Sequence, residues 1–223
     1  MARLPGGSGV HNMSRPNNMI VIATRNAGKV REFAELFAPL DIKVRSLADY
    51  EDLPPIVEDG ATFADNARIK AQVIARHLHV PVLADDSGLC VAALGGAPGV
   101  YSARYAGEGA ADAANNAKLL RELAQVAEAP PAAAGEPRLL SPAAFVCALA
   151  LVDPVANAVI EAEASCDGFI IDEPRGAGGF GYDPLFYIPG LGRTMAELAP
   201  AEKNAISHRA KALRLFLERL QHV

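Results

Sequence analysis

Tryptophan is absent from the 223-residue chain, aromatic residues make up only 6% of it, and cysteine occurs three times. The cysteines, Cys90, Cys147 and Cys166, are odd in number and form no CxxC or Cys/His pair with metal-ligand spacing. A disulfide framework and a zinc site are therefore not expected. Buried thiols in a reducing compartment explain the pattern better, which favours a cytoplasmic location.

The chain also lacks an excess of basic residues and any long apolar run. It has 21 lysines and arginines against 26 acidic residues, a net charge of −5, so no general nucleic-acid surface is expected. No apolar run reaches the roughly 18 residues of a membrane span, and no membrane partner is expected. Basic residues confined to one cleft could still bind a small polyanion.

Residues 1–18 are rich in Gly, Pro, Asn and Ser and lack the apolar centre of a signal peptide. They predict a disordered N-terminal extension. With 51% hydrophobic residues the chain can form a sizeable core. The remainder, 19–223, suits a single catalytic domain.

Strands and helices alternate in the first part of the chain. A helical repeat of apolar residues follows the first strand and ends before Pro39, and a capping box at Thr62 opens a second helix, to about His79. Buried strands are predicted at 19–23, 42–46 and 81–84.

The second part mixes one helix with several strands, which together with the first part predicts an α/β fold. The expected elements are a helix at 111–127, a surface loop at 128–142, an antiparallel pair at 145–152 and 158–164, short strands at 168–171 and 185–188, and a last helix opened by Ser207.

The polar turn between the first strand and the first helix is a candidate phosphate site. Lys29 lies in the first turn of that helix, where both a lysine and the helix N-terminus attract negative charge. The spacing is not the GxxxxGK[ST] of a P-loop, and an ordinary helix start with a solvated lysine is the alternative. The residues are Thr24, Arg25, Asn26, Ala27, Gly28 and Lys29.

Two adjacent carboxylates follow the strand at 81–84. Asp85 and Asp86 repel each other, so at a dry strand end they need a cation or strong donors. Mg²⁺ suits such a site, because it prefers one or two protein carboxylates with phosphate and water. One carboxylate could hold the metal while the other takes a proton from water. Glu58 is a weaker metal candidate, and a solvated turn is the alternative for the pair.

The glycine-rich segment 178–183 is a candidate nucleobase pocket. Glycines let a backbone approach a ligand closely, while Phe180 and Tyr182 offer ring faces for stacking. Asp183 can accept a hydrogen bond from a ring N–H. The alternative is a hairpin whose aromatic rings belong to the core.

Polar residues around the start of the last helix complete the set. Ser207 is a natural N-cap, whereas His208 and Arg209 could donate to the carbonyls of a purine. Lys70 and Lys203 are further candidates for contacts with phosphates or the base. Ordinary solvent exposure is the alternative for the histidine and the two lysines.

In this order and spacing the motifs resemble the inosine triphosphatase-like pyrophosphatases. The resemblance covers about residues 19–220 and rests on Thr24–Lys29, Leu83–Tyr105, Gly179–Pro184 and Ala205–Arg209. It implies an elongated α/β fold, with two lobes and a cleft around a long central mixed β-sheet, usually as a homodimer. It also implies Mg²⁺-dependent cleavage of ITP, dITP and XTP to the nucleoside monophosphate and pyrophosphate.

The same resemblance implies roles for single residues. Asp86 would be the general base and a metal-site acid, with Glu58 and Asp85 supporting the metal. Lys29 and Lys70 would hold the phosphates. The implied substrate-binding residues are Thr24, Arg25, Asn26, Ala27, Gly28, Lys29, Lys70, Ser87, Phe180, Gly181, Tyr182, Asp183, Lys203, His208 and Arg209.

Two other classes of function stay open on the sequence. One is a different enzyme on a similar site, such as a phosphatase that releases orthophosphate or a pyrophosphatase for modified pyrimidines. The other is a non-catalytic nucleotide sensor, against which the intact set of acids and Lys29 argues.

Overall fold

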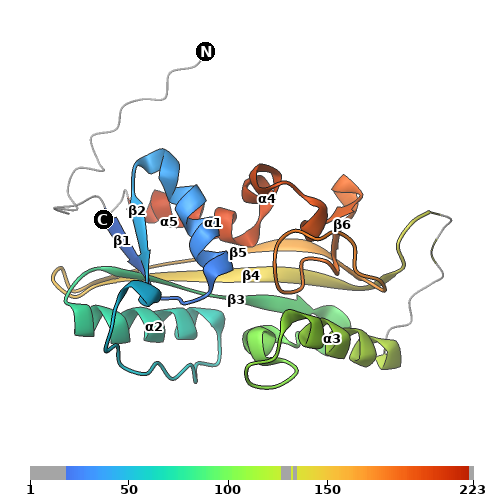
Figure 1. Ribbon diagram of the computed structural model, residues 1–223, viewed down its shortest axis with the longest axis horizontal. Helices are drawn as coiled ribbons and strands as arrows, with labels where there is room; N and C mark the ends of the chain where they lie inside the picture. The colour runs from blue at the N-terminus through green and yellow to red at the C-terminus, as the bar shows by residue number, and fades with distance from the viewer. Residues whose placement is uncertain (1–18, 127–131, 133–134, 221–223) are drawn as a thin grey trace, which may run out of the picture.

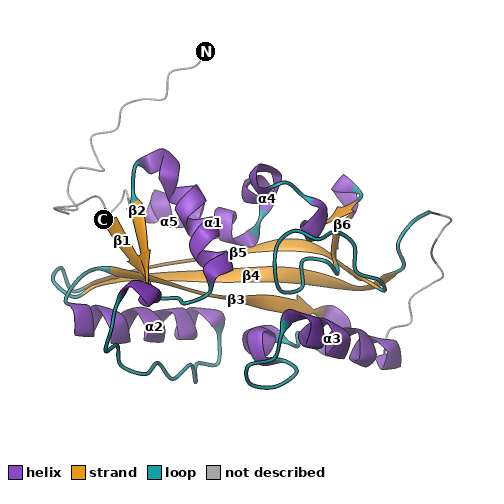
Figure 2. Cartoon of the chain, in the orientation of Figure 1, coloured by secondary structure: helices purple, strands orange, loops and turns teal. Residues whose placement is uncertain are grey.

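The computed structural model describes residues 19–126, 132 and 135–220. Within this part a seven-stranded mixed β-sheet forms the centre, and helices cover both of its faces (Figure 1, Figure 2). In sheet order the strands are β2 (Lys43–Ser46), β1 (Met19–Ile22), β3 (Val82–Val91), β4 (Leu139–Asp153), β5 (Ala158–Ile171), β6 (Phe186–Ile188) and β7 (Arg193–Thr194). The helices are α1 (Ala27–Phe37), α2 (Phe63–Leu78), α3 (Asp112–Val126), α4 (Pro200–Ile206) and α5 (His208–Leu220).

The sheet has a parallel part and an antiparallel part. β1 pairs in parallel with both β2 and β3, because α1 and α2 provide the crossovers that parallel neighbours require. β4 and β5 form a long antiparallel hairpin, and β3 pairs with β4 along its whole length. The α/β architecture predicted from the sequence is confirmed.

Alternating side chains of the strands pack against different helices. On β1, Ile20 and Ile22 join a core cluster with α1 and α5, whereas Val21 joins a cluster with α2. Leu83 and Ala84 of β3 divide in the same way. Because successive strand residues face opposite sides, this alternation also decides where the two acids that follow them point.

β3 is longer than the sequence predicts. The strand expected at 81–84 continues through Asp85 and Asp86 to Val91, so the prediction that the acids lie beyond its end is wrong. Its neighbour β1, in contrast, ends at this level of the sheet, because the last residue of β1, Ile22, pairs with Leu83. The acids therefore lie just past the carboxyl end of β1, a place where α/β sheets commonly bind ligands.

Other boundaries also differ from the prediction. Residues 168–171, expected as a separate strand, are the end of β5, and Pro142, expected in a loop, lies within β4. The last helix, opened by Ser207, is confirmed as α5, whereas α4, which precedes Ser207, was not predicted. Ser207 Oγ accepts a hydrogen bond from the Ala210 N–H at 3.2 Å, which confirms its role as a cap. The helix at 111–127 is confirmed as α3.

Two predictions fall wholly or partly on residues outside the described part of the chain. These are the disordered extension, residues 1–18, and part of the Ala/Pro-rich loop, residues 128–131 and 133–134. In the part that is described, no helix is long and apolar enough to cross a membrane.

Gly88 of β3 allows a 3₁₀ helix, η5 (Gly99–Arg104), to approach the strand closely. A Cβ at Gly88 would lie 2.4 Å from Ser102 Oγ and 2.5 Å from the carbonyl oxygen of Gly99. Gly88→Ala should therefore lower the free energy of unfolding by about 1–3 kcal/mol in urea denaturation. In Gly190→Ala, the matched control, the Cβ would meet nothing within 4 Å. Equal losses in the two variants would contradict the close approach.

Candidate active site

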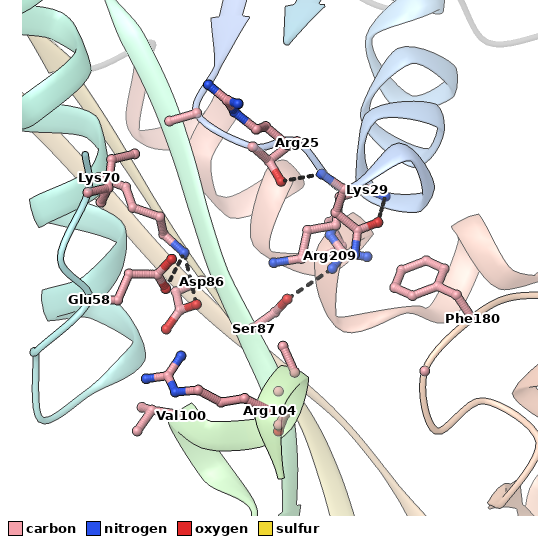
Figure 3. Close-up of a pocket in the computed structure, with 18 of the residues that line it drawn as sticks. Arg25, Lys29, Glu58, Lys70, Asp86, Ser87, Val100, Arg104, Phe180 and Arg209 are labelled. Carbon is pink, nitrogen blue, oxygen red and sulfur yellow. Dashed lines mark hydrogen bonds and ion pairs between the residues drawn. The ribbon is translucent and has the colours of Figure 1, made fainter. Parts of the chain in front are cut away.

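A pocket of about 610 Å³ lies where β1 ends and β3 continues. Its wall is built from segments between Ala23 and Arg209, and Figure 3 shows many of the side chains. Most of the residues predicted from the sequence line this pocket. Ala27, Gly28 and Asp85 are the predicted residues that are not in its lining.

The turn before α1 is fixed by its own side chains. Asn26 Oδ1 accepts hydrogen bonds from the Gly28 N–H at 2.9 Å and the Lys29 N–H at 3.2 Å. Thr24 Oγ1 accepts from the Asn26 N–H at 3.2 Å. These bonds cap the helix and occupy N–H groups of its first turn. The turn therefore offers the pocket the Lys29 ammonium rather than those two N–H groups.

Asp85 points from β3 toward α1 and α5 and is fully enclosed. Its carboxylate lies 2.9 Å from Lys29 Nζ and 3.5 Å from a guanidinium nitrogen of Arg209. Burial alone would raise the pKa of Asp85, but the charges of Lys29 and Arg209 outweigh burial and hold the pKa well below its ordinary value. Asp85 therefore stays ionised and fixes the positions of two cations.

Asp86 points to the opposite face of the sheet, toward α2. Lys70 Nζ lies 3.0 Å from Asp86 and 3.1 Å from Glu58, and Asn66 Nδ2 donates to Asp86 at 3.1 Å. Burial raises the pKa of Asp86 above its ordinary value, and the charge of Lys70 offsets only part of that rise.

Glu58 and Asp86 are the two carboxylates that could hold a divalent cation. Both contact the Lys70 ammonium, so their oxygens converge on one region. This donor set fits Mg²⁺, which completes its shell with phosphate and water. Asp85 does not join them, because it lies on the other face of β3. Within the described residues, no group of three or more His, Cys, Asp or Glu side chains converges on a metal position.

On another side of the pocket, cations and carboxylates form a buried chain. Glu32 of α1 contacts Arg209 and lies 2.7 Å from Lys203 Nζ, which in turn lies 2.7 Å from Asp183. Burial alone would raise the pKa of Glu32, but the charges of Arg209 and Lys203 lower it below its ordinary value of 4.5. Asp183 also accepts a hydrogen bond from the Phe180 N–H at 3.0 Å. The chain thus joins α1, α4 and α5 to the glycine-rich segment.

The Phe180 ring contacts two cations of this chain of charges, Lys203 and Arg209. Lys203 Nζ lies 4.8 Å from the ring centroid and the Arg209 guanidinium carbon 5.9 Å, both within cation–π range. The ring also packs on Gly28, where a Cβ would come within 2.7 Å of it. This contact explains why the first turn of α1 contains a glycine.

His208 is buried, stacks on Phe145 with ring centroids 5.0 Å apart, and lines the pocket. Within the described part of the chain its Nδ1 has no hydrogen-bond partner. Burial and the nearby charges of Arg209 and Lys203 lower the pKa of His208 well below its ordinary value, so the ring is neutral. A neutral ring with a free nitrogen can form a hydrogen bond with a ligand.

Tyr182 belongs to the pocket wall. Its side chain is buried in a core cluster with α3, and its hydroxyl donates to the Ser102 carbonyl at 2.8 Å. Of the two rings predicted to stack on a base, Phe180 is the more exposed one.

Sequence reasoning missed several residues that hold the pocket together. Asp112 Oδ2 accepts from the Gly181 N–H at 2.6 Å, and Asn116 Nδ2 donates to the Gly181 carbonyl at 3.0 Å. These contacts join segments far apart in the sequence, so no local pattern indicates them. Glu32 did leave a signal, because its place three residues after Lys29 puts both on one face of α1.

Comparison with known proteins identifies the family. Residues 20–219 match the model of the Ham1 family. The chain belongs to the Ham1 family. It is 56% identical to a dITP/XTP pyrophosphatase of Geobacillus kaustophilus (strain HTA426), over 92% of this chain and 95% of that protein. It is 50% identical to a dITP/XTP pyrophosphatase of Geobacter sulfurreducens, over 90% of this chain and 96% of that protein.

Solved Ham1 structures have the same fold. A HAM1 protein from Coxiella burnetii superposes with a TM-score of 0.77 at 42% identity, covering 92% of this chain and 99% of that chain. The Ham1 protein of Staphylococcus aureus gives a TM-score of 0.76 at 39% identity, covering 92% and 98%. The mixed sheet with flanking helices is therefore a shared Ham1 architecture.

The buried chain of charges in this Ham1 protein predicts a pH-dependent stability. Glu32→Gln should cost about 2–5 kcal/mol of unfolding free energy near pH 7, because Arg209 and Lys203 lose a buried carboxylate. The pKa of Glu32 is lower in the folded state, so its contribution is complete above its ordinary pKa of 4.5 and is lost as pH falls below it. The difference between wild type and variant should shrink on acidification.

The measurement is urea denaturation of both proteins at several pH values. Glu35→Gln, an exposed substitution on the same helix, is the matched control and should change the free energy of unfolding by less than about 0.5 kcal/mol. If the difference in unfolding free energy between wild type and Glu32→Gln stays constant with pH, Glu32 is not ionised in the way proposed here.

Proposed function

We propose that this Ham1-family chain hydrolyses the deaminated purine nucleoside triphosphates dITP, ITP and XTP to the nucleoside monophosphate and pyrophosphate. The names of relatives up to 56% identical over most of the chain support this activity. The observation that carries the proposal is one pocket with a polyphosphate side and a base side. Glu58 and Asp86 converge on the first side, and Phe180 lies on the second, while His208 also lines the pocket.

In the reaction that we propose, Asp86 removes a proton from the water that attacks the α-phosphate. Its raised pKa suits a group that must accept a proton. Lys29 and Lys70 bind the phosphates, and Asp85 holds Lys29 in place. A Mg²⁺ ion held by Glu58 and Asp86 would supply positive charge for the phosphates and lower the pKa of water.

Selection of the base would depend on donors that face the 6-keto oxygen of hypoxanthine and xanthine. His208 and Arg209 line the pocket, and the Arg209 guanidinium carbon lies 5.9 Å from the ring centroid of Phe180. The 6-amino group of adenine cannot accept their hydrogen bonds, which leaves each buried donor unpaired at about 1–3 kcal/mol. Guanine shares the keto oxygen, so its exclusion has to act at the 2-position.

We also propose that residues 19–223 form a single catalytic domain. The pocket is lined by residues from Ala23 to Arg209, so neither half of the chain contains it alone. A homodimer in the cytoplasm, with the nucleotide as the partner and no nucleic acid, is the assembly and setting that we propose.

A panel of standard and deaminated triphosphates tests the activity. With Mg²⁺, ITP, dITP and XTP should each yield pyrophosphate, while ATP should react about 10- to 100-fold more slowly for each unpaired donor. EDTA should abolish turnover. Orthophosphate as the released product would contradict the reaction, and binding of ITP without turnover would indicate a sensor.

The Asp86→Asn variant tests the assigned base. Turnover of ITP should fall by roughly 10²- to 10⁴-fold, the usual loss for an acid–base group, while the melting temperature stays close to that of the wild type. Asp59→Asn, an exposed neighbour of Glu58, is the matched control and should keep full activity. Near-normal turnover of Asp86→Asn would exclude Asp86 from the role.

A further inference from the structure

Some of the cations that line the pocket form ion pairs with shielded carboxylates, and others do not. Six lysines and arginines line it within the described residues. Four of them form ion pairs with carboxylates that are at most about one-third exposed, namely Lys29, Lys70, Lys203 and Arg209. The other two are Arg25, a predicted substrate-binding residue, and Arg104, which lies in the segment Leu83–Tyr105 but is not among the predicted site residues.

Arg104 has only a weak partner. In the described part of the chain its one ion pair is with Glu108, at 3.4 Å, and the Glu108 side chain is 88% exposed. An exposed pair of this kind contributes little energy. The guanidinium also lies 5.3 Å from the ring centroid of Tyr101, a contact that leaves its N–H donors free. Most of the hydrogen-bonding capacity of Arg104 is therefore available to a ligand.

The backbone around Arg104, in contrast, is held firmly. Its neighbours on both sides are bonded to β3, α3 and the glycine-rich segment, so the residue projects from a fixed platform. The bonds are Tyr182 Oη to Ser102 O at 2.8 Å, Leu89 N to Ser102 Oγ at 2.9 Å, Asn115 Nδ2 to Ala103 O at 3.3 Å, Lys118 Nζ to Tyr105 O at 2.7 Å and Ala106 N to Asn115 Oδ1 at 2.8 Å.

The position of Arg104 matches a phosphate ligand better than a base ligand. Figure 3 shows its guanidinium on the same side of the pocket as Glu58 and Asp86, with Phe180 on the opposite side. A nucleotide whose base lies against Phe180 must extend its phosphates toward Glu58 and Asp86. The phosphates beyond the α-phosphate then come closest to Arg104. A guanidinium fork suits phosphate oxygens, which it can bind with two parallel hydrogen bonds.

We propose that Arg104 binds the β- and γ-phosphates and stabilises the departing pyrophosphate, an inference that rests on the proposed function. The water oxygen forms a bond to the α-phosphorus, and its proton passes to Asp86. The bond between the α-phosphorus and the bridging oxygen breaks, and the electron pair leaves with pyrophosphate. Arg104 meets the negative charge that develops there.

The experiment compares inhibition by the two products. After wild type is shown to convert ITP to IMP and pyrophosphate, inhibition by added pyrophosphate is followed through IMP release. Inhibition by added IMP is followed through pyrophosphate release. In Arg104→Ala the inhibition constant for pyrophosphate should rise about 10- to 100-fold, and kcat/KM for ITP should fall by a similar factor. The constant for IMP should stay within about twofold of the wild-type value.

Three further variants separate a phosphate contact from a structural role. Arg104→Lys keeps the charge but loses the planar fork of the guanidinium. Its inhibition constant for pyrophosphate should therefore lie between the values of wild type and Arg104→Ala. Glu108→Gln removes the exposed ion pair of Arg104, and Arg121→Ala removes an exposed arginine of α3. Both should behave as wild type toward pyrophosphate and IMP.

The proposal fails if Arg104→Ala weakens inhibition by pyrophosphate and IMP equally, or changes neither. It also fails if Glu108→Gln causes the same loss, because the ion pair would then explain the effect. If wild type releases no pyrophosphate from ITP, the proposed function fails instead. Calorimetric titration of wild type and Arg104→Ala with pyrophosphate then still tests the phosphate contact directly.

Discussion

The pocket depends on one constraint, the opposite orientation of Asp85 and Asp86 within β3. Neighbouring residues of a strand point to opposite faces, so each carboxylate meets its own set of cations. Asp85 holds Lys29 and Arg209 on the side of α1 and α5, while Asp86 meets Lys70 on the side of α2. If both faced one side, they would repel each other and compete for the same partners. A single strand therefore gives two adjacent acids separate surroundings, one for ion pairs that hold the structure and one for the catalytic role that we propose.

Most of the charges in the pocket wall are paired before a substrate arrives. Lys70 lies between Glu58 and Asp86, and Lys203 lies between Glu32 and Asp183. Buried charges are tolerated only when they are paired, which explains this arrangement. A polyphosphate that arrives with a dication adds both signs at once. The dication would offset part of the added negative charge, so fewer of the existing ion pairs would have to break.

The sequence allowed the early elements to be predicted because their signals are local. The run 19–23 is β1 with one residue added, and the Thr62 cap is present, with its Oγ1 accepting from the Asp65 N–H at 3.1 Å. The extension of β3 was missed because Asp-Asp-Ser-Gly is typical of a turn, and the partners that neutralise Asp85 come from α1 and α5. The core position of Tyr182 depends on Ser102, eighty residues away in the chain, and no periodicity shows such a contact.

β4 and β5 run through both ends of the molecule without a break, over 15 and 14 residues (Figure 1). At about 3.3 Å per residue each is roughly 45–50 Å long. The core cluster with α1 and α5 and the core cluster with α3 both include side chains of these two strands. Because these two strands continue from one cluster to the other, a movement of the two clusters relative to each other would bend the β-ribbon. We therefore expect the two clusters to move relative to each other by small elastic displacements rather than by a large hinge motion.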